Sequence, residues 1–218
     1  NIRTHIIPAS SRLTPILAAR EAARVTREFE PDLTHVHYAS TFGFWGLRSG
    51  VGPLVVSVWG SDIVSFPSTW MKRRYIEKVL SGADSITATS KFLEREVKRL
   101  RPDTAEKIEV IPFGVDLPDE VTGPPDGVVR LCYIKTHKPV CGPDILLGAL
   151  AKVVREFPEI RLTMAGAGPM TEELKELAIS LDITEYVEFP GMLPRPEVDR
   201  LLADSHIMVM PSREEAFG

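Results

Sequence analysis

Cysteine is scarce in this chain of 218 residues, which contains only Cys132 and Cys141. Two cysteines cannot build the disulfide framework of a small secreted protein, and such usage is typical of a reducing compartment. Long apolar runs are also missing, since none approaches the roughly 20 residues of a membrane-spanning helix. No signal peptide is visible. These absences predict a cytoplasmic globular protein.

An excess of one sign of charge is missing too. The formal net charge is -4 at pH 7, which gives no reason to expect a nucleic-acid partner. The distribution is uneven, because residues 1–123 carry 16 Lys+Arg against 15 Asp+Glu and residues 124–218 carry 10 against 15. Basic clusters at 72–74 and 95–101 lie in the first half. We interpret them as solvated helix faces; the alternative is a surface for an anionic acceptor or for peripheral contact with anionic membrane lipid.

What the chain does contain is a regular alternation of short β-rich runs with amphipathic helical patterns. This alternation is typical of α/β folds, and it predicts two Rossmann-like parallel-sheet domains with helices on both faces of each sheet. The strand runs are almost continuously apolar, which predicts strands buried on both faces. The expected strands are 33–38, 54–59, 84–88, 107–111, 128–134, 160–165, 186–189 and 207–210.

Capping residues and apolar spacing mark the helices. Ser90 is expected to cap a helix, because a serine side chain can accept a hydrogen bond from the first turn. Leu146, Leu150, Val153 and Phe157 form an apolar stripe at helical spacing. This stripe predicts a helix that reaches residue 157.

One segment breaks the alternation. Residues 112–127 hold four prolines and three glycines and show neither a helical nor a strand period. Such a stretch is typical of a connection between compact units. It predicts an amino-terminal domain at 1–111 and a carboxyl-terminal domain at 128–218, joined by a linker at 112–127.

Two lysines occupy the loop after the expected strand at 128–134. Lys135 and Lys138 precede Gly142 and Pro143, where the next helix is expected to begin. A helix amino terminus offers backbone N–H groups and a positive dipole, and the lysines add charge, so this loop suits a diphosphate. The alternative is an ordinary loop with solvated lysines, because no complete glycine fingerprint is present.

Two later loops follow strands of the same expected sheet. Gly166 and Gly168 lie at the same sheet edge as the lysine loop, although a tight turn also explains them. Glu215 places a carboxylate at the carboxyl edge of the sheet, where open α/β sheets bind ligands. It can accept hydrogen bonds from sugar or ribose hydroxyls or stabilise developing positive charge. Glu214 can play either part, and a carboxylate here can also satisfy a helix terminus.

Five motifs occur in a specific order in the second half, and together they resemble glycosyltransferase family 4. This family comprises retaining enzymes with the two-domain glycosyltransferase B (GT-B) fold. The motifs are Ile-Pro-Phe-Gly-Val-Asp at 111–116, the lysine loop with Gly-Pro-Asp-Ile-Leu-Leu at 142–147, Gly-Ala-Gly-Pro at 166–169, Phe-Pro-Gly at 189–191, and Pro-Ser-Arg-Glu-Glu-Ala-Phe-Gly at 211–218. Segments 35–37, 59–62 and 83–90 fit the same family, so the resemblance covers nearly the whole chain.

The resemblance implies donor-side roles for one set of residues. Lys135 matches the basic residue that contacts the donor diphosphate. Glu215 matches the first glutamate of the family's E-x7-E motif, near the donor sugar, and is the expected catalytic residue. The other residues expected to hold the donor are Lys138, Gly142, Gly168, Phe217 and Gly218.

On the other side, the resemblance implies an acceptor cleft lined by His37, Trp59, Gly60 and Asp62. The acceptor is expected to be a saccharide, a lipid or another hydroxyl compound. No metal or separate cofactor is implied, since the sequence has no Asp-x-Asp motif and no His/Cys cluster of ligand spacing. The only small-molecule partner besides the acceptor is the nucleotide-sugar donor.

Three positions depart from the family pattern. Phe113 stands where the family often has asparagine, and Cys141 stands where a second basic residue is usual, for which Lys138 can compensate. Trp59 stands where a histidine often precedes the Gly-x-Asp loop. Its ring is expected either to stack on a sugar face or to pack within the fold.

The chain resembles the middle of such an enzyme. The second glutamate of E-x7-E would lie beyond Gly218, and the family's first strand and glycine-rich loop would precede Asn1. Both domains are therefore expected to be incomplete and the chain to be an internal fragment. The expected function is transfer of a sugar from a nucleotide-diphosphate sugar to a hydroxyl acceptor with retention. The alternatives are a nucleotide-sugar 2-epimerase-like isomerase on the same fold and a non-catalytic fragment.

Overall fold

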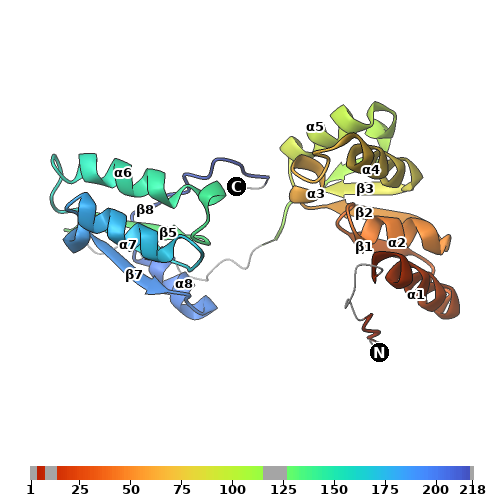
Figure 1. Ribbon diagram of the computed structural model, residues 1–218, viewed down its shortest axis with the longest axis horizontal. Coiled ribbons are helices and arrows are strands. Elements are labelled where there is room, and N and C mark those ends of the chain that lie inside the picture. Colours follow the sequence, from red (N-terminus) through yellow and green to blue (C-terminus); the bar gives the residue numbers. More distant parts are fainter. Residues whose placement is uncertain (1–3, 8–13, 115–126, 217–218) are drawn as a thin grey trace. The chain divides into compact units, whose positions relative to one another are not determined.

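A computed structural model of the chain describes residues 4–7, 14–114 and 127–216, with the backbone alone for 14–16. It contains two compact units, which are drawn in Figure 1. The amino-terminal unit comprises Asn1–Val115 with Glu215–Gly218, and the carboxyl-terminal unit comprises Asp116–Glu214. Residues 115–126 of the predicted linker lie outside the described residues, so the predicted domain boundaries stay a prediction.

The amino-terminal unit alternates strands with helices, as the sequence predicts. Its elements are α1 (Thr14–Phe29), β1 (Thr34–His37), α2 (Phe42–Ser49), β2 (Leu54–Val58), α3 (Ser61–Val64), α4 (Trp70–Gly82), β3 (Ser85–Ala88), α5 (Lys91–Leu100), the short η1 (Pro102–Lys107) and β4 (Ile108–Val110). Ser90 caps α5 as predicted, since its side chain accepts a hydrogen bond from the backbone N–H of Leu93 at 3.2 Å.

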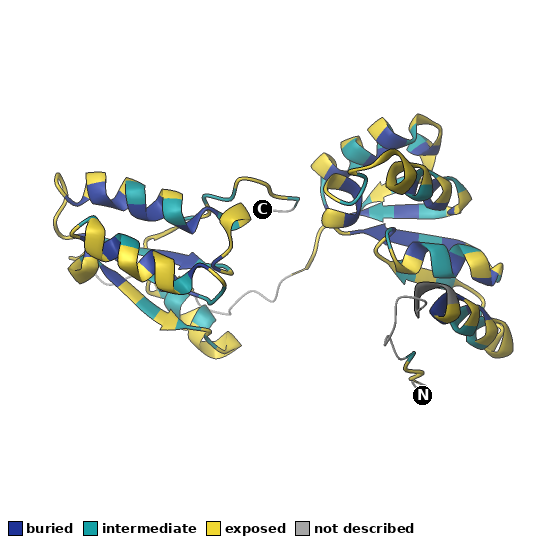
Figure 2. Ribbon diagram, in the orientation of Figure 1, coloured by how far each residue is buried: buried dark blue, intermediate teal, exposed yellow. Residues whose placement is uncertain are grey.

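The sheet of this unit runs β1-β2-β3-β4, and all neighbouring strands are parallel. Each crossover moves one strand further in the same direction, so right-handed connections bring the helices to one face. In agreement, α2 contacts β1 and β2 while α5 contacts β3 and β4. The expectation of helices on both faces is therefore wrong for the described part of this sheet. The core lies between these helices and the sheet, and Val56, Ile86 and Leu93 in it are fully buried. Figure 2 colours the buried segments of the strands and helices dark blue.

The carboxyl-terminal unit continues the alternation. Its elements are β5 (Arg130–Ile134), the short η2 (Pro139–Cys141), α6 (Pro143–Val153), β6 (Arg161–Ala165), α7 (Thr171–Ser180), the short η3 (Thr184–Tyr186), β7 (Val187–Gly191), α8 (Arg195–Ala203) and β8 (Ile207–Met208). Tyr133, Leu147 and Leu174 are among the fully buried side chains of its core, which joins α6 and α7 to the sheet. Both units are thus α/β with parallel sheets, which confirms the predicted fold class.

The strand order of this second sheet is β7-β6-β5-β8. All pairs are parallel, but the chain moves from β5 through β6 to β7 on one side and then returns to β8 on the other. Because right-handed crossovers in opposite directions lie on opposite faces, α8 covers the face opposite to α6 and α7. The order therefore reverses at β5, and β8 lies at the reversal.

The prediction that the strands are buried on both faces is wrong for the edge strands. In β1, His35 and His37 are exposed, and in β8 both Ile207 and Met208 are exposed. Only a central strand such as β2 is covered closely on both faces, because an edge strand lies beside fewer covering elements. The apolar runs indicated strands correctly but did not indicate their place in the sheet.

The predicted extent of α6 is also wrong. The helix ends at Val153, and Phe157 is 51% exposed. Its buried residues are Pro143, Leu146, Leu147, Leu150 and Ala151. The apolar stripe named the wrong buried positions, because Leu147 is buried in the core and Val153 is exposed.

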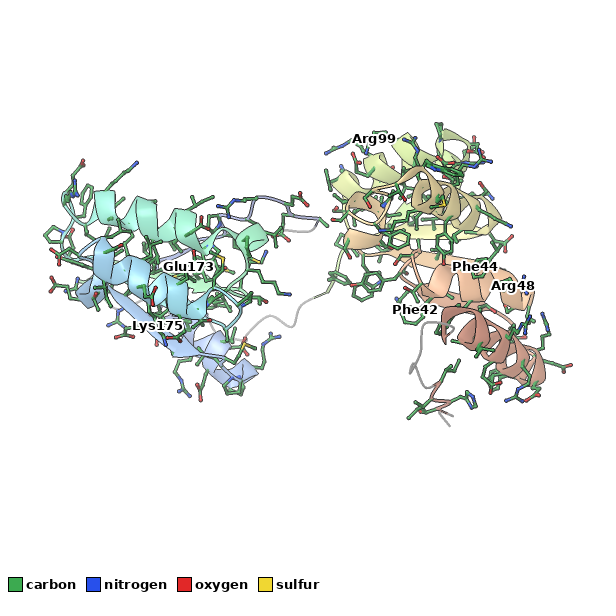
Figure 3. All side chains as sticks on the ribbon, in the orientation of Figure 1. Phe42, Phe44, Arg48, Arg99, Glu173 and Lys175 are labelled. Atoms are coloured by element: carbon green, nitrogen blue, oxygen red, sulfur yellow. The ribbon has the colours of Figure 1, made fainter. Side chains whose placement is uncertain are left out.

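Charged side chains cover the outward faces of the helices. Figure 3 labels Arg99 on α5 and Glu173 and Lys175 on α7, all of which are exposed. Most basic residues of the two clusters pair with carboxylates close in the sequence; these pairs are Arg73–Glu77, Lys98–Glu94, Arg99–Glu96 and Arg101–Asp103. This pairing agrees with solvated helix faces, and contact with a membrane stays a prediction. Over the described ranges, every helix falls short of the length and apolar character needed to cross a membrane.

Candidate functional site

The reversal of strand order in the carboxyl-terminal unit creates the first candidate site. The loops after β5 and β8 leave neighbouring strands, and the helices α6 and α8, next to these strands in the sequence, lie on opposite faces of the sheet. In open α/β sheets, ligands bind in the crevice that such diverging loops leave at the carboxyl ends of the strands. The segments 135–142 and 209–214 meet at this place, and we call the region that they frame the β5/β8 crevice.

Lys135 lies at the centre of this crevice. It follows β5 directly, and its Nζ donates a hydrogen bond to Ser212 Oγ at 3.1 Å. The side chain thus reaches from the loop after one strand to the loop after the other, and it is half-buried. A cationic amine in this place can donate to an anion that lies beside the two loops.

An ion pair ties the same two loops together. Arg213 donates to both carboxylate oxygens of Asp144, at 3.1 and 2.7 Å, and also to the carbonyl of Pro139. Its backbone N–H donates to the carbonyl of Val140 at 2.8 Å. The hydrogen bond from Arg213 holds the pKa of the Asp144 carboxyl below its ordinary value. The pair fixes the loop after β8 against the start of α6.

Gly142 allows the close approach of these loops. It adopts φ +65°, a left-handed conformation that glycine tolerates, and directly precedes α6. A Cβ atom at this position would collide with the carbonyl oxygen of Pro211. The start of α6 therefore lies against the loop after β8, with its positive dipole end at the crevice.

The loop after β6 packs onto the lysine loop. A Cβ atom on Gly166 would collide with the carbonyl of Lys135, and one on Gly168 would meet the backbone of His137 at 2.5 Å. Thr171 closes the turn by accepting a hydrogen bond from the N–H of Gly168 at 3.0 Å. Both glycines are thus explained by backbone packing, and diphosphate contact by Gly168 stays a prediction.

His137 is a buried residue that the sequence reasoning missed. Its ring is fully buried, with Nδ1 3.0 Å from Thr171 Oγ1. Within the described part of the chain its Nε2 has no hydrogen-bond partner. Burial lowers the pKa of the imidazole. Gly166 and Gly168 lie against this residue and leave no room for larger side chains beside it. Because His137 lies in a loop, no helical or strand period in the sequence indicated that it is buried.

The remaining donor-side predictions are placed differently. Lys138 is exposed just before η2. Glu215 is exposed in the loop after β8 and groups with the amino-terminal unit. There, Ser90 Oγ donates to the carbonyl of Ala216 at 2.6 Å. Phe217 and Gly218 lie outside the described residues.

Asp62 organises the acceptor-side loops of the amino-terminal unit. It is only 1% exposed. Its carboxylate accepts hydrogen bonds from the backbone N–H groups of Ala39 at 2.9 Å, Trp59 at 3.1 Å and Gly60 at 2.9 Å. Gly60 adopts φ +133° at this point. The buried carboxylate therefore joins the loop after β1 to the loop after β2 and does not face an open cleft within this unit.

Aromatic rings gather where these loops end. The Trp59 ring lies 5.4 Å from the His37 ring, 5.8 Å from Tyr38 and 4.9 Å from Phe113, between centroids. Beneath them, His35 Nε2 lies 2.7 Å from Ser57 Oγ. Burial, and then the charge of His37, lower the pKa of His35. The structure thus brings His37 and Trp59 together as the sequence predicts, with Tyr38 and Phe113 as missed members.

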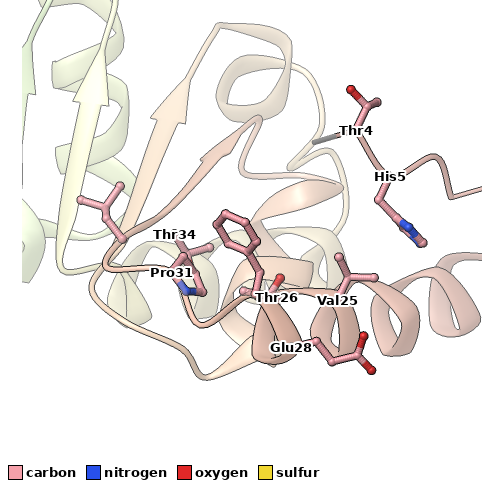
Figure 4. Close-up of a pocket in the computed structure, with 9 residues that line it drawn as sticks. Thr4, His5, Val25, Thr26, Glu28, Pro31 and Thr34 are labelled. Atoms are coloured by element: carbon pink, nitrogen blue, oxygen red, sulfur yellow. The ribbon is translucent and has the colours of Figure 1, made fainter. Parts of the chain in front are cut away.

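Hollows are also present in other parts of the described surface. One of about 690 Å³ lies beside α1 at the amino end of β1 (Figure 4), lined in part by His5, Val25, Glu28 and Thr34. Another of about 360 Å³ lies at the amino ends of β5 and β6. Neither is at a carboxyl edge, where ligands of parallel sheets bind. A third hollow, of about 400 Å³, is lined in part by His35, His37 and Trp45 and so reaches the carboxyl end of β1. Among the described side chains, no three of His, Cys, Asp or Glu form a group able to hold a metal ion.

Comparison with known protein families matches both halves of the chain. Residues 2–118 match the family described as Glycosyltransferase Family 4, and residues 118–218 match Glycosyl transferases group 1. The two matches cover nearly the whole chain and meet close to the predicted linker.

Relatives and solved structures agree with this match. The chain is 28% identical to a GDP-mannose-dependent alpha-(1-6)-phosphatidylinositol monomannoside mannosyltransferase of Mycolicibacterium smegmatis, over 78% of this chain and 47% of that protein. It is 26% identical to a D-inositol 3-phosphate glycosyltransferase of Thermomonospora curvata, over 86% of this chain and 52% of that protein. The chain thus spans about half the length of the curated relatives it matches.

Among solved structures, Anabaena Alr3699/HepE in complex with UDP and glucose matches with a TM-score of 0.76. Identity is 18%, and the match covers 95% of this chain and 60% of that one. The apo form of the lipopolysaccharide outer core galactosyltransferase WaaB matches with a TM-score of 0.69 and 17% identity, over 94% and 57% of the two chains. At these identities the likeness shows the fold.

Proposed function

Because the chain belongs to glycosyltransferase family 4, we propose that it carries the binding machinery of an enzyme that moves a sugar from a nucleotide-diphosphate sugar to a hydroxyl acceptor, with retention of configuration. The observation that carries the proposal is the β5/β8 crevice. There, Lys135, the start of α6 and the loop after β8 converge at a reversal of strand order.

The crevice supplies what a departing diphosphate requires. The leaving group accumulates negative charge as the bond to the sugar breaks, so fixed positive charge beside it lowers the barrier. Lys135 provides a cation, and the dipole of α6 adds partial positive charge at its first turn. Ser212 holds the lysine amine in the crevice, which reduces the freedom that binding must remove. Lys138 can add charge from the exposed side of the loop.

Glu215 has the role of orienting the donor sugar. It follows the loop that Arg213 and Asp144 fix, so its backbone begins from a defined point. Its carboxylate accepts hydrogen bonds from sugar hydroxyls and stabilises positive charge that develops on the sugar ring. Phe217 and Gly218 continue this donor-side segment.

The amino-terminal unit has the role of binding the acceptor. His37 and Trp59 lie at the carboxyl edge of its sheet, and Asp62 fixes the loops that carry them. The curated relatives are named for GDP-mannose and inositol phosphate substrates, and one matching structure holds UDP and glucose. These names support a nucleoside-diphosphate sugar as donor and a polyhydroxyl compound as acceptor.

Calorimetric titration tests the donor site. UDP-, GDP- and ADP-sugars are titrated into the wild-type chain, Lys135→Ala and the control Lys175→Ala, whose lysine lies on the outer face of α7. At least one sugar nucleotide should bind, and Lys135→Ala should weaken it by about 2 kcal/mol, or roughly thirtyfold. Lys175→Ala should bind as the wild type does.

Two outcomes count against the proposal. If no sugar nucleotide binds, the function is wrong; if Lys135→Ala binds normally, the crevice assignment is wrong. Product analysis separates transfer from the epimerase alternative, because only transfer consumes an acceptor. Binding without turnover would favour the non-catalytic alternative.

A further inference from the structure

His137 is buried in the loop that carries Lys135, and the function proposed above gives it no part. Its ring is fully buried, and its Nε2 has no hydrogen-bond partner among the described residues. A buried nitrogen without a partner costs free energy, which an apolar side chain of similar size would not. The presence of a polar ring here is therefore explained by its other nitrogen, Nδ1.

Nδ1 joins the lysine loop to the start of α7. It lies 3.0 Å from Oγ1 of Thr171, which is the first residue of that helix. The hydroxyl is fixed in its turn, because it accepts from the N–H of Gly168 at 3.0 Å and donates to the carbonyl of Gly168 at 2.9 Å. This arrangement favours the tautomer in which Nδ1 carries the proton and donates to Thr171.

The backbone of His137 adds two further hydrogen bonds to the same neighbouring loop. Its N–H donates to the carbonyl of Ala167 at 3.2 Å, and its carbonyl accepts from the N–H of Met170 at 3.1 Å. Together with the ring contact, three hydrogen bonds fix residue 137 to the loop after β6. Lys135 lies two residues earlier, between this fixed point and the end of β5, so its backbone has little freedom.

We propose that His137 is a positioning residue for the donor diphosphate, since through Thr171 it holds the lysine loop in the conformation that places Lys135 in the β5/β8 crevice. This inference rests on the proposed function and adds a residue to its donor site. A lysine side chain loses much rotamer freedom when it is ordered. With its backbone fixed through His137 and its amine held by Ser212, that loss is met before the diphosphate binds.

The alternative role for His137 is packing alone. Its ring lies 6.0 Å from the ring of Tyr133 and 6.2 Å from that of Phe189, between centroids. Two substitutions separate the roles. His137→Leu keeps a side chain of similar size and removes the hydrogen bond to Thr171. His137→Asn loses volume, but its amide nitrogen can take the place of Nδ1.

Calorimetric titration of UDP and GDP into the 218-residue chain tests the proposal, with thermal unfolding of each variant measured beside it. His137→Leu should bind the nucleoside diphosphate about tenfold more weakly than the wild type, at a melting temperature that is no lower. His137→Asn should melt at a lower temperature because it leaves a cavity, but should bind within about twofold of the wild type. Packing alone predicts the opposite order for binding.

Ile183→Val is the matched control for a loss of stability. Ile183 is 1% exposed and belongs to the same core, between α7 and η3. The variant should melt at a lower temperature and bind the nucleoside diphosphate as the wild type does. If nucleotide affinity instead falls in parallel with melting temperature across these variants, the positioning role is wrong.

A double-mutant cycle shows whether His137 acts through Lys135. In a chain that already carries Lys135→Ala, His137→Leu should weaken binding by less than about twofold, because no amine remains to be positioned. Equal losses in the two backgrounds would overturn the proposal. If His137→Leu fails to fold, Thr171→Val removes the same contact from the other side and replaces it in the cycle.

The failure of this proposal is distinguishable from failure of the proposed function. If a nucleoside diphosphate binds and Lys135→Ala weakens it, while His137→Leu binds as the wild type does, the donor site stands and His137 only fills space. If neither UDP nor GDP binds the wild-type chain, the proposed function and this inference are both wrong.

Discussion

The two units share an architecture but differ in the order of their strands. The sheet of the amino-terminal unit follows the sequence, β1-β2-β3-β4, whereas that of the carboxyl-terminal unit reverses at β5, in the order β7-β6-β5-β8. Only the second order makes neighbouring loops diverge. The carboxyl-terminal unit therefore obtains a crevice from topology alone, at the place where Lys135 meets Ser212.

The amino-terminal unit has no such reversal among its described strands, and its surface features come from its loops. The buried carboxylate of Asp62 fixes the loops after β1 and β2. These loops carry exposed rings such as that of Trp59. The carboxyl-terminal unit therefore depends on the close backbone approach that Gly142 allows. The amino-terminal unit depends instead on the buried carboxylate of Asp62. Each dependence can be broken separately.

The largest effect should follow Asp62→Ala. The change leaves three backbone N–H groups without their acceptor, so we expect the amino-terminal unit to lose about 4 kcal/mol of stability. All three tryptophans of the chain, Trp45, Trp59 and Trp70, lie in this unit, so denaturant unfolding followed by tryptophan fluorescence reports it selectively. Asp103→Ala, at an exposed ion pair, is the control and should change stability little. An unchanged unfolding midpoint in Asp62→Ala would contradict the role of the carboxylate.

Gly142→Ala should have the next largest effect, confined to the other unit. The added methyl group meets the Pro211 carbonyl and imposes a strained φ, which together should cost about 3 kcal/mol. Hydrogen exchange of β5 and β6 amides measures the loss, while the tryptophan transition should stay in place. If both units lose stability equally, the two dependences are not separate.

Acidification should weaken the carboxyl-terminal unit through His137. Burial lowers the pKa of this imidazole in the folded chain, so the unfolded chain binds a proton first as pH falls. The contribution of the neutral ring is complete above pH 6.5, the ordinary pKa, and is lost progressively below it. Hydrogen exchange of β6 between pH 7.5 and 5.5 should show this loss in the wild type and a flatter profile in His137→Leu. Parallel profiles would show that His137 is not the group responsible.

Gly148→Ala should produce the smallest effect, and of opposite sign. A Cβ atom there meets nothing within 4 Å, and the residue lies inside α6. Alanine should therefore stabilise the unit by about 0.5–1 kcal/mol, because it restricts the unfolded chain and favours the helix. Thermal unfolding by circular dichroism checks the sign. If Gly148→Ala is less stable than the wild type, the stability loss of Gly142→Ala cannot be assigned to close backbone approach alone.

Much of the fold could be predicted because its signals are local. Apolar runs located the eight strands of the described residues, and Ser90 was recognised as a cap from its residue type. The edge positions of β1 and β8 could not be predicted, because exposure of an edge strand depends on which strands pair, a contact between distant parts of the chain. For the same reason Phe157, apolar and correctly spaced, is exposed.

The candidate site divides in the same way. Lys135 and Gly142 were predicted from their place between a strand and a helix. The Arg213–Asp144 pair and the buried His137 were missed, because each depends on loops that only the folded sheet brings together. Asp62 was predicted for the acceptor side, but nothing in its sequence context indicated that it is buried. The sequence thus predicts which chemical groups a loop carries better than it predicts which residues the loop contacts.

The most direct test of the account is hydrogen exchange with and without a nucleoside diphosphate, either UDP or GDP, at saturating concentration. The account predicts protection of backbone amides at 135–142 and 209–214, the two sides of the β5/β8 crevice, and loss of that protection in Lys135→Ala. Protection elsewhere in the carboxyl-terminal unit with these segments unchanged, or equal protection in Lys135→Ala, would contradict it.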